Sequence, residues 1–234
     1  MKSYIDELDR NIFNFVEYEG YDDRYPSLSM QAFSSDFYDE IRHASRRLFQ
    51  IFCKAAKVFQ MAPDDFARNM DMPDNLIPYL HKSNALGLST WLSRFDFVLD
   101  VNGNLRMVEL NADTPCFLIE SYYANEIAAN YVGRKHPNIE CRKELHTFLK
   151  RMYDAVLSAK YGRNQYESMR ANRESLPKDP FVFSCFHDYF EDYGTTQFLM
   201  KELKTACPEV DTRFISFYDM KIDDEGIPLA DGSH

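Results

Sequence analysis

The N-terminal third of the chain carries apolar residues at helical spacing. The first run of them predicts a helix over residues 4–18. A longer stripe, from Phe37 to Phe59, predicts a second helix that Ser34 or Ser35 can cap. Apolar residues at this spacing usually pack against a core, and we expect the stripe to do so. Two short helices are predicted next, over residues 63–69 and 73–80.

The pattern changes to strict alternation further along the chain. Polar and apolar residues alternate over residues 94–100 and again over 105–111, with Asn102-Gly103 between the two runs. An Asn-Gly pair between alternating runs is a strong signal for a β-hairpin with a two-residue type I′ turn. The sequence therefore predicts two antiparallel strands joined at this pair.

Helices and strands alternate over the rest of the chain. Helices are predicted over 114–132, 138–160 and 191–206, and buried strands over 181–186 and 213–217. Residues 161–179 are polar and charged, which fits either a helix or an excursion without regular structure. Strands separated by helices indicate an α/β fold. Here it is a helix-rich one with a central hairpin and further strands.

The predicted two-residue turn fixes how the hairpin strands pair. On one face Asp96 lies opposite Glu109, and Arg94 lies opposite Asn111. The other face is expected to pair Phe95 with Leu110, Phe97 with Val108, and Leu99 with Arg106. That second face is almost wholly apolar and should pack on the core, because a one-residue slip would bury the charges instead.

Two opposed carboxylates, Asp96 and Glu109, need a compensating positive charge. Opposed side chains have Cβ atoms about 5 Å apart, and like charges there destabilise a sheet. Arg94 supplies part of the compensation, and Mg²⁺ can supply the rest, since carboxylates and the Asn111 carbonyl are hard oxygen ligands. An arginine beside such a metal suits the charge of a phosphoryl transition state. Alternation and turn chemistry alone favour a surface hairpin whose charges face water in an ion-pair lattice, because a polar outer face is usual for an antiparallel strand.

The residues after the second strand predict an anion site. Thr114 is a good N-cap and Pro115 suits the first helical position. The free N–H groups of a helix start can bind a carboxylate or a phosphate. A metal and arginine face beside such a helix start would suit the phosphorylation of a carboxylate.

The composition of the chain limits the classes of partner that we expect for it. The 234 residues carry a net charge of −10, which argues against nucleic acid as a partner. The five cysteines are widely spaced without a C-x-x-C pair, which indicates reduced thiols rather than disulfides or a zinc site. No stretch approaches the ~20 apolar residues of a membrane span, and the acidic N-terminus does not read as a signal peptide. We therefore expect a cytoplasmic protein without a membrane partner.

The hairpin motif resembles that of a known family. The runs are Arg94-Phe95-Asp96-Phe97 and, after the turn, Glu109-Leu110-Asn111-Ala112-Asp113-Thr114-Pro115. They look like the RxDF…E-x-N-A-D signature of the glutathionylspermidine synthase family, and of its stand-alone acid–amine ligase branch in particular. The resemblance divides the chain into an N-terminal helical segment, 1–70, and a synthetase-like domain, 71–234.

The resemblance implies an ATP-grasp-type ligase that uses ATP and Mg²⁺. Such an enzyme forms an acyl phosphate, which an amine attacks to give an amide. By position Asp96, Glu109 and Asn111 would be the Mg²⁺ ligands. Arg94 would be catalytic and would contact ATP and the acyl phosphate, with Phe95 and Asp96 beside it at the nucleotide.

The resemblance also suggests substrate contacts. Thr114 and Cys116 fall where the family uses serines to hold a peptide, and Glu191 and Asp192 fall near an acidic pair at the peptide and polyamine site. The implied substrates are a small acid or thiol peptide and an amine or polyamine. Pro115 and the replaced serines depart from the synthase pattern and match the acid–amine ligase branch better, which leaves glutathione and spermidine open.

The chain does not resemble the nucleotide-binding half of an ATP-grasp enzyme. A later lysine pair, a glycine-rich flap and a second acidic metal cluster are not recognisable in it. We therefore expect the front, pre-ATP-grasp portion of a longer enzyme, inactive as a fragment.

Other functions stay open from the sequence. The chain could be a non-catalytic module that binds an anion or peptide at the Thr114 helix, or a metal-dependent hydrolase using Asp96 and Glu109. Cys116 at a helix start, with His187 as a distant base, could act as a nucleophile. The run from residue 187 to 192 could bind a metal, could be a polar loop and helix start, or could form a pocket for a cationic substrate.

Overall fold

The computed structural model describes residues 3–17, 25–85, 87, 90–113, 115–171, 180–223 and 227. The chain forms two compact units, which are described separately. Unit 1 comprises Met1–Leu28 and Cys116–His234, and unit 2 comprises Ser29–Pro115. The predicted boundary after residue 70 falls inside unit 2, and that domain division stays a prediction. Over the residues just given, no helix is long and apolar enough to cross a membrane.

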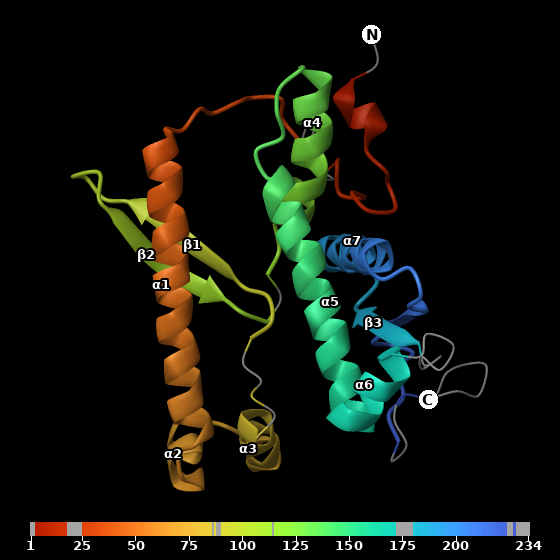
Figure 1. Cartoon of the computed structure of the whole chain (residues 1–234). Coiled ribbons are helices and arrows are strands. Elements are labelled where there is room, and N and C mark those ends of the chain that lie inside the picture. The colour runs from red at the N-terminus through yellow and green to blue at the C-terminus, as the bar shows by residue number, and fades with distance from the viewer. Residues whose placement is uncertain are drawn as a thin grey trace. The chain divides into compact units, whose positions relative to one another are not determined.

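Unit 2 contains helices and the hairpin (Figure 1). Its helical elements are α1 (Ser35–Gln60), α2 (Asp64–Asn69), η2 (Asp74–Leu76) and α3 (Ile77–Ala85). The Ser34 side chain accepts a hydrogen bond from the backbone N–H of Phe37 at 3.2 Å, as expected for an N-cap. The predicted helices of this region are confirmed.

The expectation that the whole apolar stripe of α1 packs into a core is wrong. No residue of α1 is fully buried, and Ile51 and Val58 are 57% and 70% exposed. The helix instead turns the face that carries Phe52 toward the hairpin and α3. These partners are narrower than the stripe, so they cover only part of it.

The hairpin forms as predicted only in the half far from the turn, which carries the four predicted site residues. Strands β1 (Arg94–Leu99) and β2 (Leu105–Asn111) are antiparallel. Arg94 pairs with Asn111, Phe95 with Leu110 and Asp96 with Glu109, as predicted. Nearer the turn the pairs are Phe97 with Met107, Val98 with Arg106 and Leu99 with Leu105, so the predicted partners of Phe97 and Leu99 were wrong.

The cause is the turn. A type I′ turn needs positive φ at both central residues, but here Gly103 has φ +79° and Asn102 does not share that conformation. Asp100 instead closes a three-residue loop, donating its N–H to the Asn104 carbonyl and accepting from Gly103 N–H, both at 2.9 Å. The Asp100 carboxylate accepts backbone N–H bonds from Asn102 and Asn104, which stabilises this loop.

A β-bulge in the hairpin reverses the register shift that the three-residue loop causes. The three-residue loop shifts the pairing by one residue, and continued regularly it would place Glu109 opposite Phe95 on the apolar face. A β-bulge between Asp96 and Phe97, with Val108 as the extra residue on β2, shifts the pairing back. The bulge is therefore what brings Glu109 and Asn111 to the face of Asp96.

The first segment of unit 1 is not the predicted helix. Only Tyr4–Glu7 is helical, as the short 3-10 turn η1. The chain turns afterwards, because the Asp9 carboxylate accepts hydrogen bonds from the backbone and side-chain N–H groups of Asn11. Ile12 and Val16 are buried all the same. The apolar spacing thus marked burial, which an irregular chain achieves here.

The helix expected to begin at residue 114 starts later. Phe117 has φ +79°, outside the helical region, and Leu118 caps the π-helical η3 (Ile119–Ala124), which runs into α4 (Asn125–Tyr131). Thr114 itself lies outside the described residues. The predicted anion site at a Thr114 helix start is therefore not formed by this helix.

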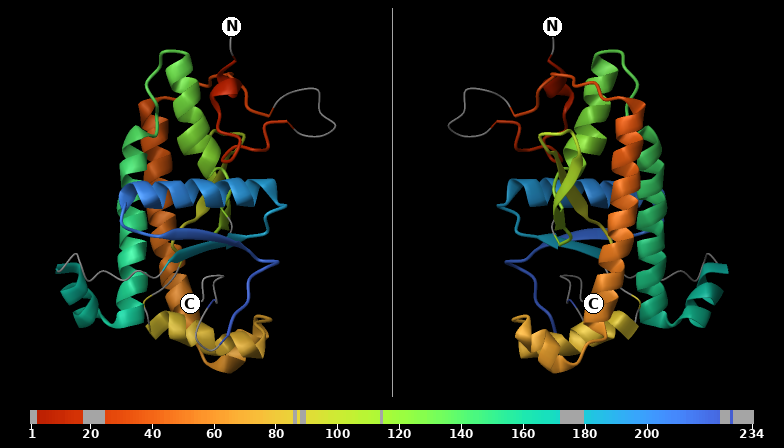
Figure 2. Two further views of the ribbon diagram at one scale, coloured as in Figure 1. Left: turned by 90° about the vertical axis from the view of Figure 1, so that its right-hand side faces the viewer. Right: turned by 90° about the vertical axis from the view of Figure 1, so that its left-hand side faces the viewer.

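The remainder of unit 1 follows the prediction closely. Its elements are α5 (Ile139–Tyr161), α6 (Arg163–Ala171), β3 (Phe181–Cys185), α7 (Phe190–Ala206) and β4 (Thr212–Ser216). Of the segment left open, the described part is mainly helix α6, and residues 172–179 lie outside the described residues. Strands β3 and β4 are parallel, and Figure 2 shows α7 running along them. The α/β class is confirmed.

Candidate functional site

The polar face of the hairpin brings four predicted site residues together. Arg94 and Asp96 alternate on β1 toward the same side, and their cross-strand partners are Asn111 and Glu109. Arg94 donates two hydrogen bonds to Asp96, from Nε to Oδ1 at 2.7 Å and from one terminal nitrogen to Oδ2 at 2.8 Å. A terminal nitrogen also lies 3.7 Å from Glu109 Oε1.

The opposite face explains why these polar groups point away from the core. The Phe95 ring lies 5.9 Å from that of Phe52 on α1, and 6.1 Å from that of Phe97. Leu110 lines the adjoining groove of about 350 Å³ against α1 and α3. Because this face is held by apolar packing, Phe95 lies behind the polar face rather than on it.

Arg94 controls the charge of this face. Its hydrogen bonds lower the pKa of Asp96 below the ordinary value, against an opposing effect of partial desolvation. Asp96 is therefore ionised at neutral pH, and the guanidinium offsets the repulsion between the two opposed acids.

Asn111 leaves an acceptor without a partner. Its side-chain oxygen is buried and receives no hydrogen bond within the described residues. A buried polar atom without a partner is costly, and such atoms in native structures call for a physical explanation. A cation bound to this oxygen would satisfy it.

The ligand atoms of this face are of the type that Mg²⁺ prefers. Asp96, Glu109 and Asn111 offer only oxygen atoms, and Mg²⁺ in such sites takes one or two carboxylates together with phosphate oxygens and waters. The described residues hold no group of three or more His, Cys, Asp or Glu placed to bind a metal by themselves. A metal on the hairpin would thus depend on the Asn111 amide and on ligands from outside the protein.

Glu191 and Asp192 lie in the first turn of α7, directly after the loop that follows β3. Acids are favourable there because of the helix dipole. Partial burial, and then the charge of Glu191, raise the pKa of Asp192. The loop and helix-start interpretation of residues 187–192 agrees with this arrangement.

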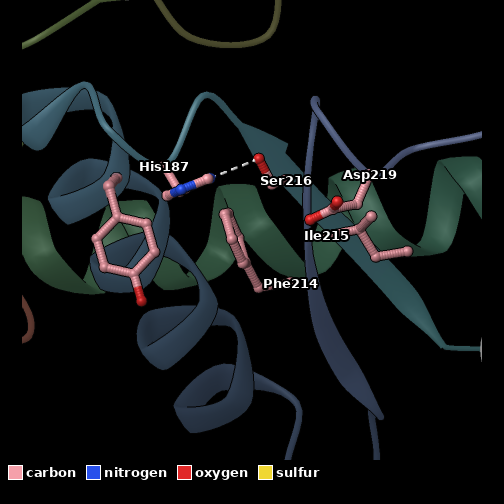
Figure 3. A pocket seen from close by; sticks show the side chains of 6 residues that line it. His187, Phe214, Ile215, Ser216 and Asp219 are labelled. Carbon is pink, nitrogen blue, oxygen red and sulfur yellow. Dashed lines mark hydrogen bonds between the residues drawn. The ribbon is translucent and has the colours of Figure 1, made fainter.

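A pocket of about 520 Å³ lies beside this helix start (Figure 3). Its lining residues are His187, Tyr193, Phe214, Ile215, Ser216 and Asp219. His187 Nδ1 lies 2.8 Å from the hydroxyl oxygen of Ser216, which ties the loop after β3 to the end of β4. The carboxyl ends of parallel strands are the usual ligand sites of open α/β sheets.

Sequence reasoning missed most of this pocket. Tyr193, Ser216 and Asp219 were not singled out, although the position of Ser216 at the end of a predicted strand was a usable signal. The pairing of Cys116 with His187 lost its main support. Cys116 precedes the helix N-cap Leu118 rather than occupying a helix start, and His187 contacts Ser216.

The family model described as "Glutathionylspermidine synthase preATP-grasp" matches residues 4–233. The match therefore runs through both units, with the hairpin inside it. The comparison with curated proteins found no match.

Proposed function

Because the chain belongs to the glutathionylspermidine synthase family, as its pre-ATP-grasp portion, we propose that it supplies half of the active site of a carboxylate–amine ligase. This ligase would use ATP and Mg²⁺ to activate a carboxylate as an acyl phosphate and would join it to an amine. The observation that carries the proposal is the hairpin face, where two acids, an arginine and an unpartnered amide oxygen converge.

Each residue has a role that its surroundings support. Asp96, Glu109 and Asn111 would hold Mg²⁺, which when bound would neutralise phosphate oxygens. Arg94 orients the Asp96 carboxylate through two hydrogen bonds. Its fixed positive charge would stabilise the charge that develops on the transferred phosphoryl group. Phe95, packed behind the face, would hold β1 in place rather than contact ATP.

The amine would bind in unit 1. Glu191 and Asp192 place two acidic groups at the start of α7, beside the pocket at the ends of β3 and β4. Ammonium groups are attracted to such acids. Cys116 and Thr114 stay proposed contacts of the acid or thiol peptide.

The metal site is tested by a double variant, Asp96→Ala with Glu109→Ala, in the enzyme that contains this chain. We expect loss of ATP turnover and of Mn²⁺ binding measured by electron paramagnetic resonance. Glu140→Ala with Glu167→Ala is the matched control, because it removes the same charge from exposed positions. Unchanged ATP turnover in the Asp96 and Glu109 double variant would overturn the metal site.

The substrates are tested by ATP hydrolysis against panels of acids, thiol peptides and amines. The ligase proposal expects hydrolysis coupled to amide formation only when a suitable acid and amine are both present. A thiol tripeptide with a polyamine as the productive pair would identify the synthase reaction itself. Productive pairs elsewhere in the panel would identify another acid, and ATP turnover without any amide product would contradict the ligase proposal.

A further inference from the structure

A buried ion pair joins helices α5 and α7 within unit 1. The Glu202 side chain of α7 is only 1% exposed and receives two hydrogen bonds from Arg142 of α5, at 3.0 and 2.7 Å. His146 Nε2 lies 2.5 Å from the same carboxylate. Arg142 also contacts Glu126 of α4. We call the Arg142–Glu202 pair the α5–α7 latch.

The charge of Arg142 in this latch acts on His136, a buried side chain without a hydrogen-bond partner among the described residues. It precedes α5 in the chain and is 5% exposed, and both of its ring nitrogens are buried with no hydrogen bond from any described residue. A buried imidazole normally satisfies at least one nitrogen. Its uncharged form is tolerated here, but the protonated form would need an acceptor at once.

The charges around His136 determine what protonation would do. Glu126 of α4 attracts a positive charge on the ring, and Arg142 of α5 repels it. His146 of α5 already contacts the Glu202 carboxylate of the latch. Glu126 is therefore the carboxylate for which a protonated His136 would have to compete, and Arg142 now holds it.

We propose that His136 is a proton-operated release for the α5–α7 latch. When His136 takes up a proton, its ring competes with Arg142 for Glu126, and the two neighbouring cations repel each other. Arg142 is thereby displaced, and Glu202 loses its strongest partner in the interior. The contact between α5 and α7 loosens as a result.

The release would also act on the proposed amine site, and this one consequence rests on the proposed function. Helix α7 carries Glu191 and Asp192 in its first turn and Glu202 further along. Loosening α7 at Glu202 would disturb its start, so mild acidification would weaken amine binding. The latch itself is tested on this chain without ATP or substrate, so its failure is separable from failure of the ligase proposal.

The sign of the pH dependence follows from the environment of His136. Burial first, and then Arg142, lower its pKa against the opposing effect of Glu126. The unfolded chain takes up a proton near pH 6.5, whereas the folded chain does so only at lower pH. The contribution of the uncharged His136 ring to the free energy of unfolding is therefore complete above about pH 6.5 and falls as the pH drops below that value. For this one group, the unfolding constant rises by at most about tenfold per pH unit.

Other groups must be separated from this effect. Hydrogen bonds from the ring to Asp64 and to the Gln60 carbonyl raise the pKa of His81 in unit 2. That histidine therefore adds stability that is lost as the pH rises, the opposite sign. The pKa of Glu202 is lowered, so its loss of stability belongs to more acidic solution. The difference between variants from pH 7.5 to 5.5 isolates His136.

The test compares His136→Phe, which keeps a ring of similar size without a titrating group, with the same substitution at the exposed His43. Urea unfolding is followed between pH 7.5 and 5.5. We expect the unfolding constant to rise more steeply on acidification in the wild type and in His43→Phe than in His136→Phe. Equal slopes in all three proteins would overturn the proposal.

A second measurement serves if His136→Phe does not fold. In the wild-type chain, nuclear magnetic resonance follows the His136 ring and the Nε–H of Arg142. We expect the ring to titrate below pH 6.5 and the Arg142 Nε–H to exchange faster with water through the same transition, although intrinsic exchange slows on acidification. A ring titrating at or above pH 6.5, or an Arg142 signal that stays protected through the transition, contradicts the release.

Discussion

The carboxylate of Asp96 lies directly across the hairpin from that of Glu109, and Arg94 contacts both. Opposed like charges would destabilise the hairpin by themselves. The arginine is therefore part of the structure of the face as well as of its proposed chemistry.

Replacing Arg94 with Met should raise the pKa of Asp96, because the hydrogen bonds that hold it low are lost. Asp96 has a lowered pKa in the folded chain, so it contributes stability above its unfolded pKa and loses it as the pH falls through the folded value. That contribution should disappear in the variant. Carboxyl ¹³C titration measures it, and Arg106→Met, which removes a contact to Asp100 instead, should leave Asp96 unchanged.

Gly103 should be sensitive to substitution for reasons of backbone alone. Its φ is +79°, and a Cβ placed on it would meet nothing within 4 Å. Gly103→Ala should therefore cost about 1 kcal/mol from left-handed strain, whereas Gly103→Asn should cost less, since Asn tolerates that conformation. Urea unfolding compares the two, and equal losses would argue against a backbone cause.

Gly194 should behave in the opposite way from most helical glycines. An alanine in the middle of a helix normally stabilises it by about 1 kcal/mol relative to glycine. Here a Cβ would lie 2.3 Å from the Ile12 carbonyl oxygen and 3.0 Å from a methyl carbon of Ile119. Gly194→Ala should therefore destabilise unit 1 by ~2 kcal/mol.

Thermal and urea unfolding measure this loss. Thr205→Ala, at an exposed position of the same helix, should be close to neutral and serves as the control. A stabilised Gly194→Ala protein would mean that α7 does not approach the backbone of Ile12 this closely.

Breaking the α5–α7 latch from one side should be costly. Arg142→Met leaves the Glu202 carboxylate buried beside a single histidine, and removing one partner of a buried ion pair costs about 3–5 kcal/mol. The double variant Arg142→Met with Glu202→Met removes both charges and should recover much of that loss. Urea unfolding at pH 7.5 measures the free energies of unfolding of the two variants. A double variant no more stable than the single one would contradict the ion-pair account.

The alternation of residues 94–111 was enough to predict the hairpin and the four residues of its polar face. Side chains alternate with period two, so only one register kept the charges off the apolar face. The family motif added the proposed chemistry. The turn was predicted wrongly, because the Asp100 side chain accepts the backbone N–H groups of Asn102 and Asn104. In a type I′ turn the Asn104 N–H would instead bond to the Val101 carbonyl.

Only the tertiary structure shows that the β-bulge reverses the register shift caused by the three-residue loop of the hairpin. Nothing in the local pattern marks Val108 as a bulge, yet the bulge returns Glu109 to Asp96 after the three-residue loop has displaced it. Local pattern also gave no sign that the apolar residues of the first segment, such as Ile12 and Val16, would be buried without a helix. It gave no sign either that the buried His136 would lack a hydrogen-bond partner among the described residues while the charge of Arg142 acts on it.

What the sequence by itself determined was thus the set of elements with strong periodicity and the residue types of the proposed metal site. Those depend on near neighbours in the chain, whose spacing is visible in one dimension. Registers, helix starts and buried charges depend on contacts between residues far apart in sequence, such as Arg142 with Glu202 and Gly194 with Ile12. Only the folded chain brings these pairs together, so only the tertiary structure could decide them.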